Sequence, residues 1–177
     1  SRRRARVPMS APRAVLFGCA GPDLTPDERA FFRDADPLGF ILFARNVDTP
    51  ERTRRLAEDL RAAVGRADAP VLIDQEGGRV QRLQPPLWPA YPPGAAYGAI
   101  YAQDKAKGLA AAKLGARLIA ADLQELGINV DCLPLADVPV SGADQVIGNR
   151  AYGDTPEQVA AVAQEVVIRT VSIKETE

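Results

Sequence analysis

Short apolar runs alternate with longer amphipathic segments along most of the chain. The runs are continuous rather than alternating, which is typical of parallel strands covered on both faces. We therefore expect strands at residues 14–19, 39–43, 69–74 and 129–138. Each run is followed, directly or after a loop, by a segment with the period of a helix. Strand and helix repeated four times predict an α/β fold with right-handed crossovers.

Three of the four expected helices carry the same start signal, a threonine followed by proline and an acidic residue. Thr25, Thr49 and Thr155 are the expected N-caps, with proline at the first helical position, where its missing N–H costs nothing. Glu28 and Gln158 stand three residues after the first and the last of these threonines. This spacing predicts a capping box at both helices.

The remaining helix has a regular apolar stripe at spacings of three and four residues, and Gly127 follows as its stop signal. The residues of the stripe are Leu109, Ala112, Ala116, Ile119, Leu123 and Leu126.

Two folds share this alternation of strands and helices. A doubly wound, nucleotide-binding sheet should carry a G-x-G-x-x-G turn and a later acidic residue, and the segment GCAG at 18–21 does not match it. The (β/α)8 TIM barrel is therefore favoured. Four units make only about half of a barrel that typically needs about 250 residues, so we expect only about the first half in this chain of 177 residues.

Composition narrows the function further. The formal net charge of −1 argues against electrostatic binding of nucleic acid or of a membrane surface, and no apolar stretch approaches the roughly 20 residues of a membrane span. The chain has no histidine, which excludes hydrolases that use an imidazole of this chain. Cys19 and Cys132 lack metal-site spacing, so no metal is expected, and both are predicted to be buried, reduced thiols.

The two ends differ from the body. Residues 1–12 are basic and expected to be a disordered extension, in which Met9 is a candidate start. Residues 168–177 leave the Ala-rich helical pattern abruptly. This change suggests a frame break or an artificial end, with a natural tail as the alternative.

The segment VLIDQEGGRVQRL at 71–83 is the main candidate for chemistry, because the active site of a barrel lies at the carboxyl ends of its strands. Asp74 can accept hydrogen bonds from neighbouring sugar hydroxyls, and Arg82 and Arg150 offer planar donor forks. Asp74 and Glu76 could instead be an acid and nucleophile pair, or only the polar edge of a turn.

Other residues of the same region have two possible roles. Gly77 and Gly78 permit positive φ and a close backbone approach to a ligand. The aromatic residues Trp88, Tyr91 and Tyr97 of the proline-rich loop 85–98 could line a site or could simply pack. Asp137 and the loop 142–153 follow the fourth expected strand and belong to the same edge.

Four motifs carry a resemblance to a known family. They are GFILFARNV (39–47), IDQEGGRVQRL (73–83), GARLIAADLQELGINVDCLPLADV (115–138) and IGNRAYG (147–153). In this order and spacing, residues 13–167 resemble the N-terminal part of the catalytic barrel of bacterial β-N-acetylhexosaminidases of glycoside hydrolase family 3. These cytoplasmic, cofactor-independent enzymes remove terminal β-linked N-acetylglucosamine from peptidoglycan fragments (muropeptides) during cell-wall recycling.

The resemblance implies a role for each matching residue. It makes Asp74 a ligand of the hydroxyls of N-acetylglucosamine, Arg82 and Arg150 further substrate contacts, and Glu76 a residue that structures the loop. The family's acid/base histidine and nucleophilic aspartate lie in later segments that this sequence does not contain, so no catalytic residue is assigned here. The chain is expected to be inactive alone.

Two alternatives remain open. The chain could be a non-catalytic, sugar-binding remnant of such an enzyme. A half-barrel would also leave its first and fourth strands as open edges, so self-association through them, or a failure to fold alone, is the other expectation.

Overall fold

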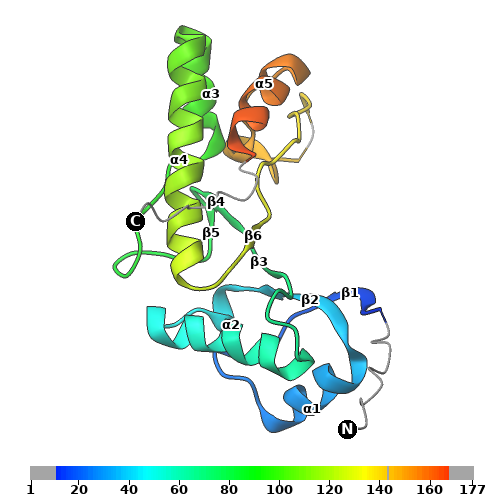
Figure 1. The fold of residues 1–177 in the computed structure, drawn as a ribbon. Coiled ribbons are helices and arrows are strands. Elements are labelled where there is room, and N and C mark those ends of the chain that lie inside the picture. Colours follow the sequence, from blue (N-terminus) through cyan, green and yellow to red (C-terminus); the bar gives the residue numbers. More distant parts are fainter. Residues whose placement is uncertain (1–10, 143, 168–177) are drawn as a thin grey trace, which may run out of the picture.

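The computed structural model of the protein describes residues 11–142 and 144–167 (Figure 1). The tail at 168–177 lies outside these residues, as does the expected N-terminal extension apart from Ala11 and Pro12.

The central feature is a four-stranded parallel sheet whose spatial order β1-β2-β3-β6 follows the order in the chain (Figure 1). Its strands are β1 (Arg13–Phe17), β2 (Pro37–Leu42), β3 (Val71–Ile73) and β6 (Val130–Asp131). A doubly wound sheet would reverse its order at a switch point, whereas a barrel adds each strand beside the last. The fold is therefore an α/β fold of the TIM-barrel type, of which the chain holds a part.

The last strand is shorter than expected. The prediction of a strand over 129–138 is wrong beyond Asp131, where β6 ends. Pro134 and Pro139 have no N–H to donate to a ladder, and prolines are excluded from the interior of a strand.

The helices begin where the threonines predicted. They are α1 (Pro26–Ala35), α2 (Pro50–Val64), α3 (Gly94–Gln103), α4 (Lys105–Glu125) and α5 (Pro156–Val166), with short 3-10 turns η1 (Ala44–Asn46) and η2 (Gly148–Arg150). The hydroxyls of Thr25, Thr49 and Thr155 each accept the backbone N–H of the residue three positions on. The stripe of α4 is confirmed, with five of its members buried, and Gly127 ends the helix at φ 70°.

The two capping boxes have different outcomes. At α1 the box is complete, because Glu28 also accepts the backbone N–H of Thr25 at 3.0 Å. At α5 the prediction is wrong. The side chain of Gln158 donates instead to the carbonyl oxygens of Gly98, at 3.1 Å, and Tyr152, at 2.9 Å. Its amide group thus ties α5 to α3 and to the preceding loop.

Helix α3 and a small antiparallel hairpin, β4 (Gln75–Gly77) with β5 (Val80–Gln81), were not expected. Helix α3 is rich in glycine and alanine and has no apolar stripe. Its glycines fit close to a neighbouring loop. A Cβ atom at Gly94 would lie 2.1 Å from the carbonyl oxygen of Arg150, and one at Gly98 would lie 2.1 Å from that of Tyr152.

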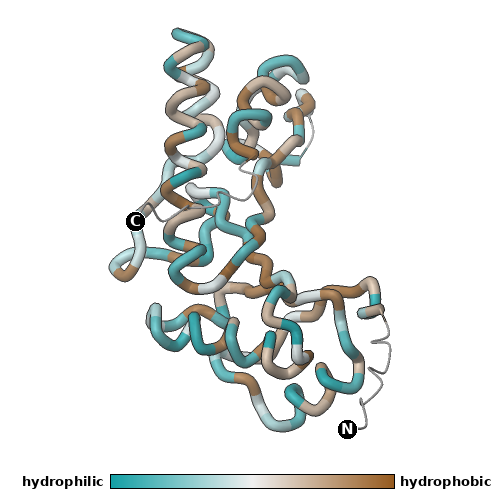
Figure 2. The backbone as a smooth tube through the Cα atoms, viewed as in Figure 1, coloured by the Kyte–Doolittle hydropathy of each residue, from teal (hydrophilic) through white to brown (hydrophobic). Residues whose placement is uncertain are grey.

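Two hydrophobic clusters hold these elements. The larger lies between the sheet and helices α1, α2 and α4, and the smaller lies among α3, α4 and α5 (Figure 1). In Figure 2 hydrophobic segments follow β2 and β3, whereas α1 and α2 are largely hydrophilic. Among the described residues, every helix is too short or too polar to cross a membrane.

The aromatic residues of the proline-rich segment belong to these clusters. Trp88 and Tyr91 lie in the larger cluster and Tyr97 in the smaller, each only 9% exposed. The hydroxyl of Tyr91 donates to Asp122 on α4 at 2.6 Å. Of the two roles considered for these rings, the structure shows packing.

The close approach of α3 to the loop can be tested with Gly98→Ala. The added methyl group would collide with backbone rather than with a flexible side chain, so we expect the free energy of unfolding to fall by about 2 kcal/mol, as in other overpacked sites. Gly21→Ala is the matched control, because nothing lies within 4 Å of the added carbon. Urea denaturation measures both, and equal stability of the two variants would contradict the packing described.

Candidate functional site

The candidate site lies where β3 and β6 end and the hairpin begins (Figure 1). Residue Ile73 pairs with Asp131 in the parallel register, which places Asp131 and Cys132 beside Asp74. Asp131 then accepts the backbone N–H of Gln75 at 3.0 Å. The start of the hairpin is therefore fixed to the last described strand by a side-chain contact.

Two buried glutamines form the inside of the hairpin. The side-chain oxygen of Gln75 accepts the backbone N–H groups of Arg82, at 2.8 Å, and Leu83, at 2.9 Å. The side chain of Gln81 donates to the carbonyl of Pro89 at 2.7 Å and accepts the N–H of Tyr91 at 3.0 Å. An unpartnered buried amide costs about 1–3 kcal/mol, so these contacts hold both the hairpin and the segment after it.

The turn of the hairpin uses both glycines of the motif. Gly77 has φ 91° and Gly78 has φ 58°, which confirms the prediction of positive φ. A Cβ at Gly77 would lie 2.4 Å from the carbonyl oxygen of Pro92, and one at Gly78 would lie 2.7 Å from Cβ of Pro93. The close approach is thus to the proline-rich segment of the chain, not to an open ligand site.

The structure brings Asp74 and Arg82 together. Arg82 Nη2 donates to Asp74 Oδ2 at 2.7 Å, and both side chains remain about one quarter exposed, at 27% and 25%. Arg82 Nε is buried and has no hydrogen-bond partner within the described part of the chain. The pair is consequently held in place and still accessible from solvent.

Arg150, in η2, pairs with Glu76 of the hairpin. Its Nε donates to Oε2 at 2.8 Å and its Nη2 donates to Oε1 at 2.6 Å, a two-point contact between residues 74 positions apart. The predicted site residues therefore form two ion pairs, and the charge of Asp74 is close enough to Arg150 to raise the pKa of that guanidinium further. Sequence reasoning expected Glu76 to structure the loop, and this contact confirms that role.

Glu76 does not suit the alternative of an acid and nucleophile pair with Asp74. Both of its oxygens are engaged by Arg150, and its side chain is only 8% exposed. A nucleophile or general acid needs an oxygen that reaches the reacting bond. Asp137, the other acidic residue considered, is exposed beyond the strand.

Asp131 is the group that sequence reasoning missed. Its pKa is raised to about 7, mainly by burial. The hydrogen bond from the backbone N–H of Gln75 lowers the pKa, and repulsion from Asp74 and Glu76 raises it. A carboxyl group thus titrates near neutral pH in a chain that has no histidine. The available signal was an acidic residue inside an otherwise apolar run.

Cys132 corrects another prediction. Cys19 is buried as expected, but Cys132 is exposed, because β6 ends one residue before it. Partial desolvation, followed by the neighbouring carboxylate of Asp74, raises the pKa of the Cys132 thiol to about 11. The group is therefore a neutral thiol at neutral pH.

In the described residues, no group of three or more histidine, cysteine, aspartate or glutamate side chains is placed to hold a metal ion.

A parallel sheet in barrel order, with acidic and basic side chains at its carboxyl edge, is typical of barrel enzymes. The sequence matches the family described as "Glycosyl hydrolase family 3 N terminal domain" over residues 24–172. The chain belongs to this family, which confirms the resemblance seen in its motifs.

Individual relatives agree with this assignment. The beta-hexosaminidase of Methylococcus capsulatus is 38% identical over 149 residues, which are 84% of this chain and 42% of that protein. A beta-hexosaminidase of Xanthomonas axonopodis pv. citri is also 38% identical, over 148 residues. The chain spans less than half the length of these relatives.

Solved structures are similar over the same region. NagZ from Neisseria gonorrhoeae, in complex with N-trifluoroacetyl-D-glucosamine, has a TM-score of 0.80 at 32% identity, covering 88% of this chain and 45% of that one. A family 3 beta-N-acetylglucosaminidase from Paenibacillus has a TM-score of 0.75 at 32% identity, covering 86% and 28%.

The raised pKa of Asp131 predicts a pH-dependent stability. Between the ordinary value of 3.8 and about 7, the unfolded chain releases this proton and the folded chain keeps it. The free energy of unfolding should therefore fall as the pH rises through this range, by up to about 4 kcal/mol from this one group. Asp131→Asn should abolish this part of the decline, because an amide does not titrate. Its oxygen can still accept the backbone N–H of Gln75, so the fold should be kept.

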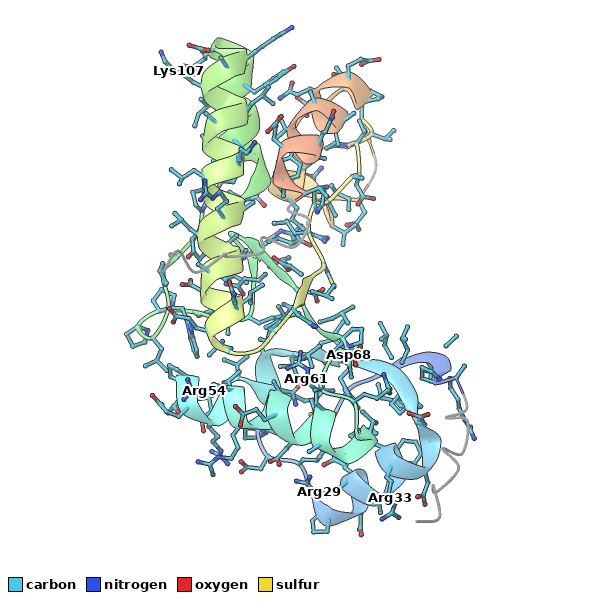
Figure 3. The ribbon with its side chains drawn as sticks, in the orientation of Figure 1. Arg29, Arg33, Arg54, Arg61, Asp68 and Lys107 are labelled. Atoms are coloured by element: carbon cyan, nitrogen blue, oxygen red, sulfur yellow. The ribbon has the colours of Figure 1, made fainter. Side chains whose placement is uncertain are left out.

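Urea denaturation at pH 4.5 and pH 8 measures the effect. The difference in free energy of unfolding, Asp131→Asn minus wild type, should be more positive at pH 8 than at pH 4.5. Asp68→Asn is the control, since Asp68 is exposed on the loop before β3 (Figure 3). The same pH profile in Asp131→Asn and in the wild type would rule out Asp131 as the titrating group.

Proposed function

We propose that the chain is the sugar-binding part of a retaining β-N-acetylhexosaminidase. The complete enzyme would remove terminal β-linked N-acetylglucosamine from peptidoglycan fragments during cell-wall recycling, in the cytoplasm. The names of the relatives support the activity, since they are beta-hexosaminidases and a beta-N-acetylglucosaminidase. One similar structure holds an N-acylated glucosamine derivative.

The observation that carries the proposal is the Asp74–Arg82 pair at the carboxyl end of β3. A carboxylate can accept hydrogen bonds from two adjacent sugar hydroxyls, and a guanidinium beside it can donate to sugar oxygens. The two groups already hold each other at 2.7 Å, so little reorganisation is needed when a sugar binds. Arg150, whose charge interacts with that of Asp74, leaves its Nη1 edge as a further donor.

In this proposal, the nucleophile and the acid/base group of the complete enzyme lie in other segments than this chain. In a retaining mechanism a carboxylate attacks the sugar to form a covalent intermediate while a second group protonates the leaving oxygen. Asp74 and Glu76 are both held by arginines, and the chain has no histidine. We therefore propose that it binds muropeptide sugars without hydrolysing them, and that neither a metal nor an organic cofactor takes part.

The alternative is a non-catalytic sugar-binding remnant. Both proposals predict binding, so they are separated by fusing the chain to the part of the Methylococcus relative that follows its matched region. Hydrolysis by the fusion supports the enzyme fragment. A folded, sugar-binding fusion without hydrolysis supports the remnant.

Self-association is a further proposal. Strands β1 and β6 are the outer strands of the described sheet, and Leu16 and Val130 on them are exposed. Open edges of this kind can pair with another copy. Sedimentation at increasing concentration would detect it.

Binding is tested by titrating the purified chain with N-acetylglucosamine, using calorimetry or NMR. We expect saturable binding that weakens about 10-fold or more in Asp74→Asn, because a hydrogen bond to a charged group contributes about 1.5–3 kcal/mol. Asp68→Asn should bind like the wild type. The same preparations should not turn over 4-nitrophenyl N-acetyl-β-D-glucosaminide. Turnover that disappears in Asp74→Asn would refute the assignment of chemistry to other segments, and absence of binding would refute the sugar site.

A further inference from the structure

The hairpin and the loop before η2 hold each other through arginines that run in opposite directions. From the turn of the hairpin, Arg79 Nη2 donates to the backbone carbonyls of Gln145 and Ile147 at 3.2 Å each and also contacts that of Val146. From η2, Arg150 donates back to Glu76 in β4. Each segment thus supplies one arginine to the other, Arg79 through Nη2 alone and Arg150 through a two-point contact.

Glu76 fixes the plane of the Arg150 guanidinium. A two-point contact sets both the position and the orientation of the group, which a single bond does not. Glu76 is itself almost fully buried, at 8% side-chain exposure, and it lies close enough to Asp131 to act on its pKa. A buried carboxylate beside a second carboxyl group needs a positive partner. Loss of the contact would leave the charge of Glu76 buried without compensation, which is strongly unfavourable.

The backbone of Arg150 is fixed as well. Its carbonyl lies against Gly94 at the start of α3, where no Cβ would fit, and the next two residues, Ala151 and Tyr152, are each 3% exposed. Nε and Nη2 are taken by Glu76, whereas Nη1 has only a long contact of 3.3 Å, to the carbonyl of Val146, among the described residues. The Nη1 edge is therefore the one that is left to donate to a ligand.

We propose that Glu76 is a positioning residue that holds Arg150 so that its Nη1 edge meets the sugar. This inference rests on the proposed sugar-binding function and deepens it. Glu76 itself does not touch the sugar. Glu76 therefore contributes to sugar affinity only by orienting Arg150, so changes at the two residues should not have additive effects on affinity.

The first test replaces Glu76 with an amide of the same shape. Glu76→Gln keeps the volume but offers one acceptor and one N–H donor to two arginine donors, so the two-point contact is lost. The affinity for N-acetylglucosamine should fall about 10-fold, as in Arg150→Lys. The double variant should bind no more than about threefold more weakly than either single variant, because both remove the same interaction. Glu58→Gln, an exposed glutamate on α2, is the matched control and should bind normally.

A second readout does not depend on the sugar. The side-chain Nε–H signal of Arg150 in a ¹⁵N NMR spectrum is identified by its absence in Arg150→Lys. In the wild type this proton is bonded to Glu76 and should exchange slowly, whereas in Glu76→Gln it should exchange at least 10-fold faster. In Glu58→Gln it should exchange as in the wild type. A wild type that binds no sugar refutes the proposed function, while the exchange rates still decide whether Glu76 holds Arg150.

Glu76→Asp covers the case in which Glu76→Gln does not fold. It keeps the charge but draws the guanidinium back by one methylene, so the chain should stay folded and bind the sugar more weakly. Wild-type affinity in either folded variant, or unchanged exchange of the Arg150 Nε–H in Glu76→Gln, would overturn the inference. Circular dichroism establishes which variants are folded before binding is measured.

Discussion

Asp74, Glu76 and Asp131 gather where β3 and β6 end, and the cost of removing carboxyl groups from water beside one another is the constraint around which the site is built. Asp74 is compensated by Arg82 and Glu76 by Arg150. No third arginine is paired with Asp131 in the described residues, and its pKa rises to about 7. Charges that cannot be solvated must be paired or neutralised; Asp74 and Glu76 are paired, and Asp131 keeps its proton up to a higher pH.

The same contacts connect the site to the rest of the fold. Asp131 holds the first residue of the hairpin, and the glutamines of the hairpin hold the segment that leads to α3. Helix α3 in turn lies against the backbone of Arg150. The sheet and the smaller helical cluster are thus connected through polar contacts of the hairpin.

The surface of the two first helices differs from this region. Arg29, Arg33 and Arg54 project from α1 and α2, on the outside of the sheet (Figure 3). Arg29 pairs with Asp59 at 3.0 Å, with both side chains more than one third exposed. Exposed pairs of this kind contribute little to stability, whereas the pairs at the hairpin are half-buried or deeper and each sits beside a further carboxyl group.

Much of the framework could be predicted from the sequence, because it depends on local signals. Continuous apolar runs gave the parallel strands in barrel order, and each Thr-Pro pair marked the start of a helix. The positive φ of Gly77 and Gly78 follows from the glycine pair itself, whereas the contact of Asp74 with Arg82 was not predicted, although only eight positions separate them.

The predictions that failed or were missed concern features that depend on contacts between residues far apart in the chain. Helix α3 has no apolar period by which it could be recognised. Its glycines at 94 and 98 are instead required by close contact with the backbone of residues 150–152, more than 50 positions away. The side chain of Gln158 abandons its capping box for carbonyls of α3 and the loop before α5. Neither Arg150 nor Glu76 carries a local sign of the other, since 74 positions separate them.

The residues that support the candidate sugar contacts all lie inside the chain. Arg82 holds Asp74, Glu76 and Gly94 fix Arg150, and Asp131 holds the start of the hairpin. A site organised in this way before its ligand arrives loses less conformational freedom on binding. The proposed sugar contacts can therefore form without the catalytic groups, because covalent catalysis requires a nucleophile and an acid that the arginine-bound carboxylates do not provide. This separation is the physical reason to expect binding without turnover.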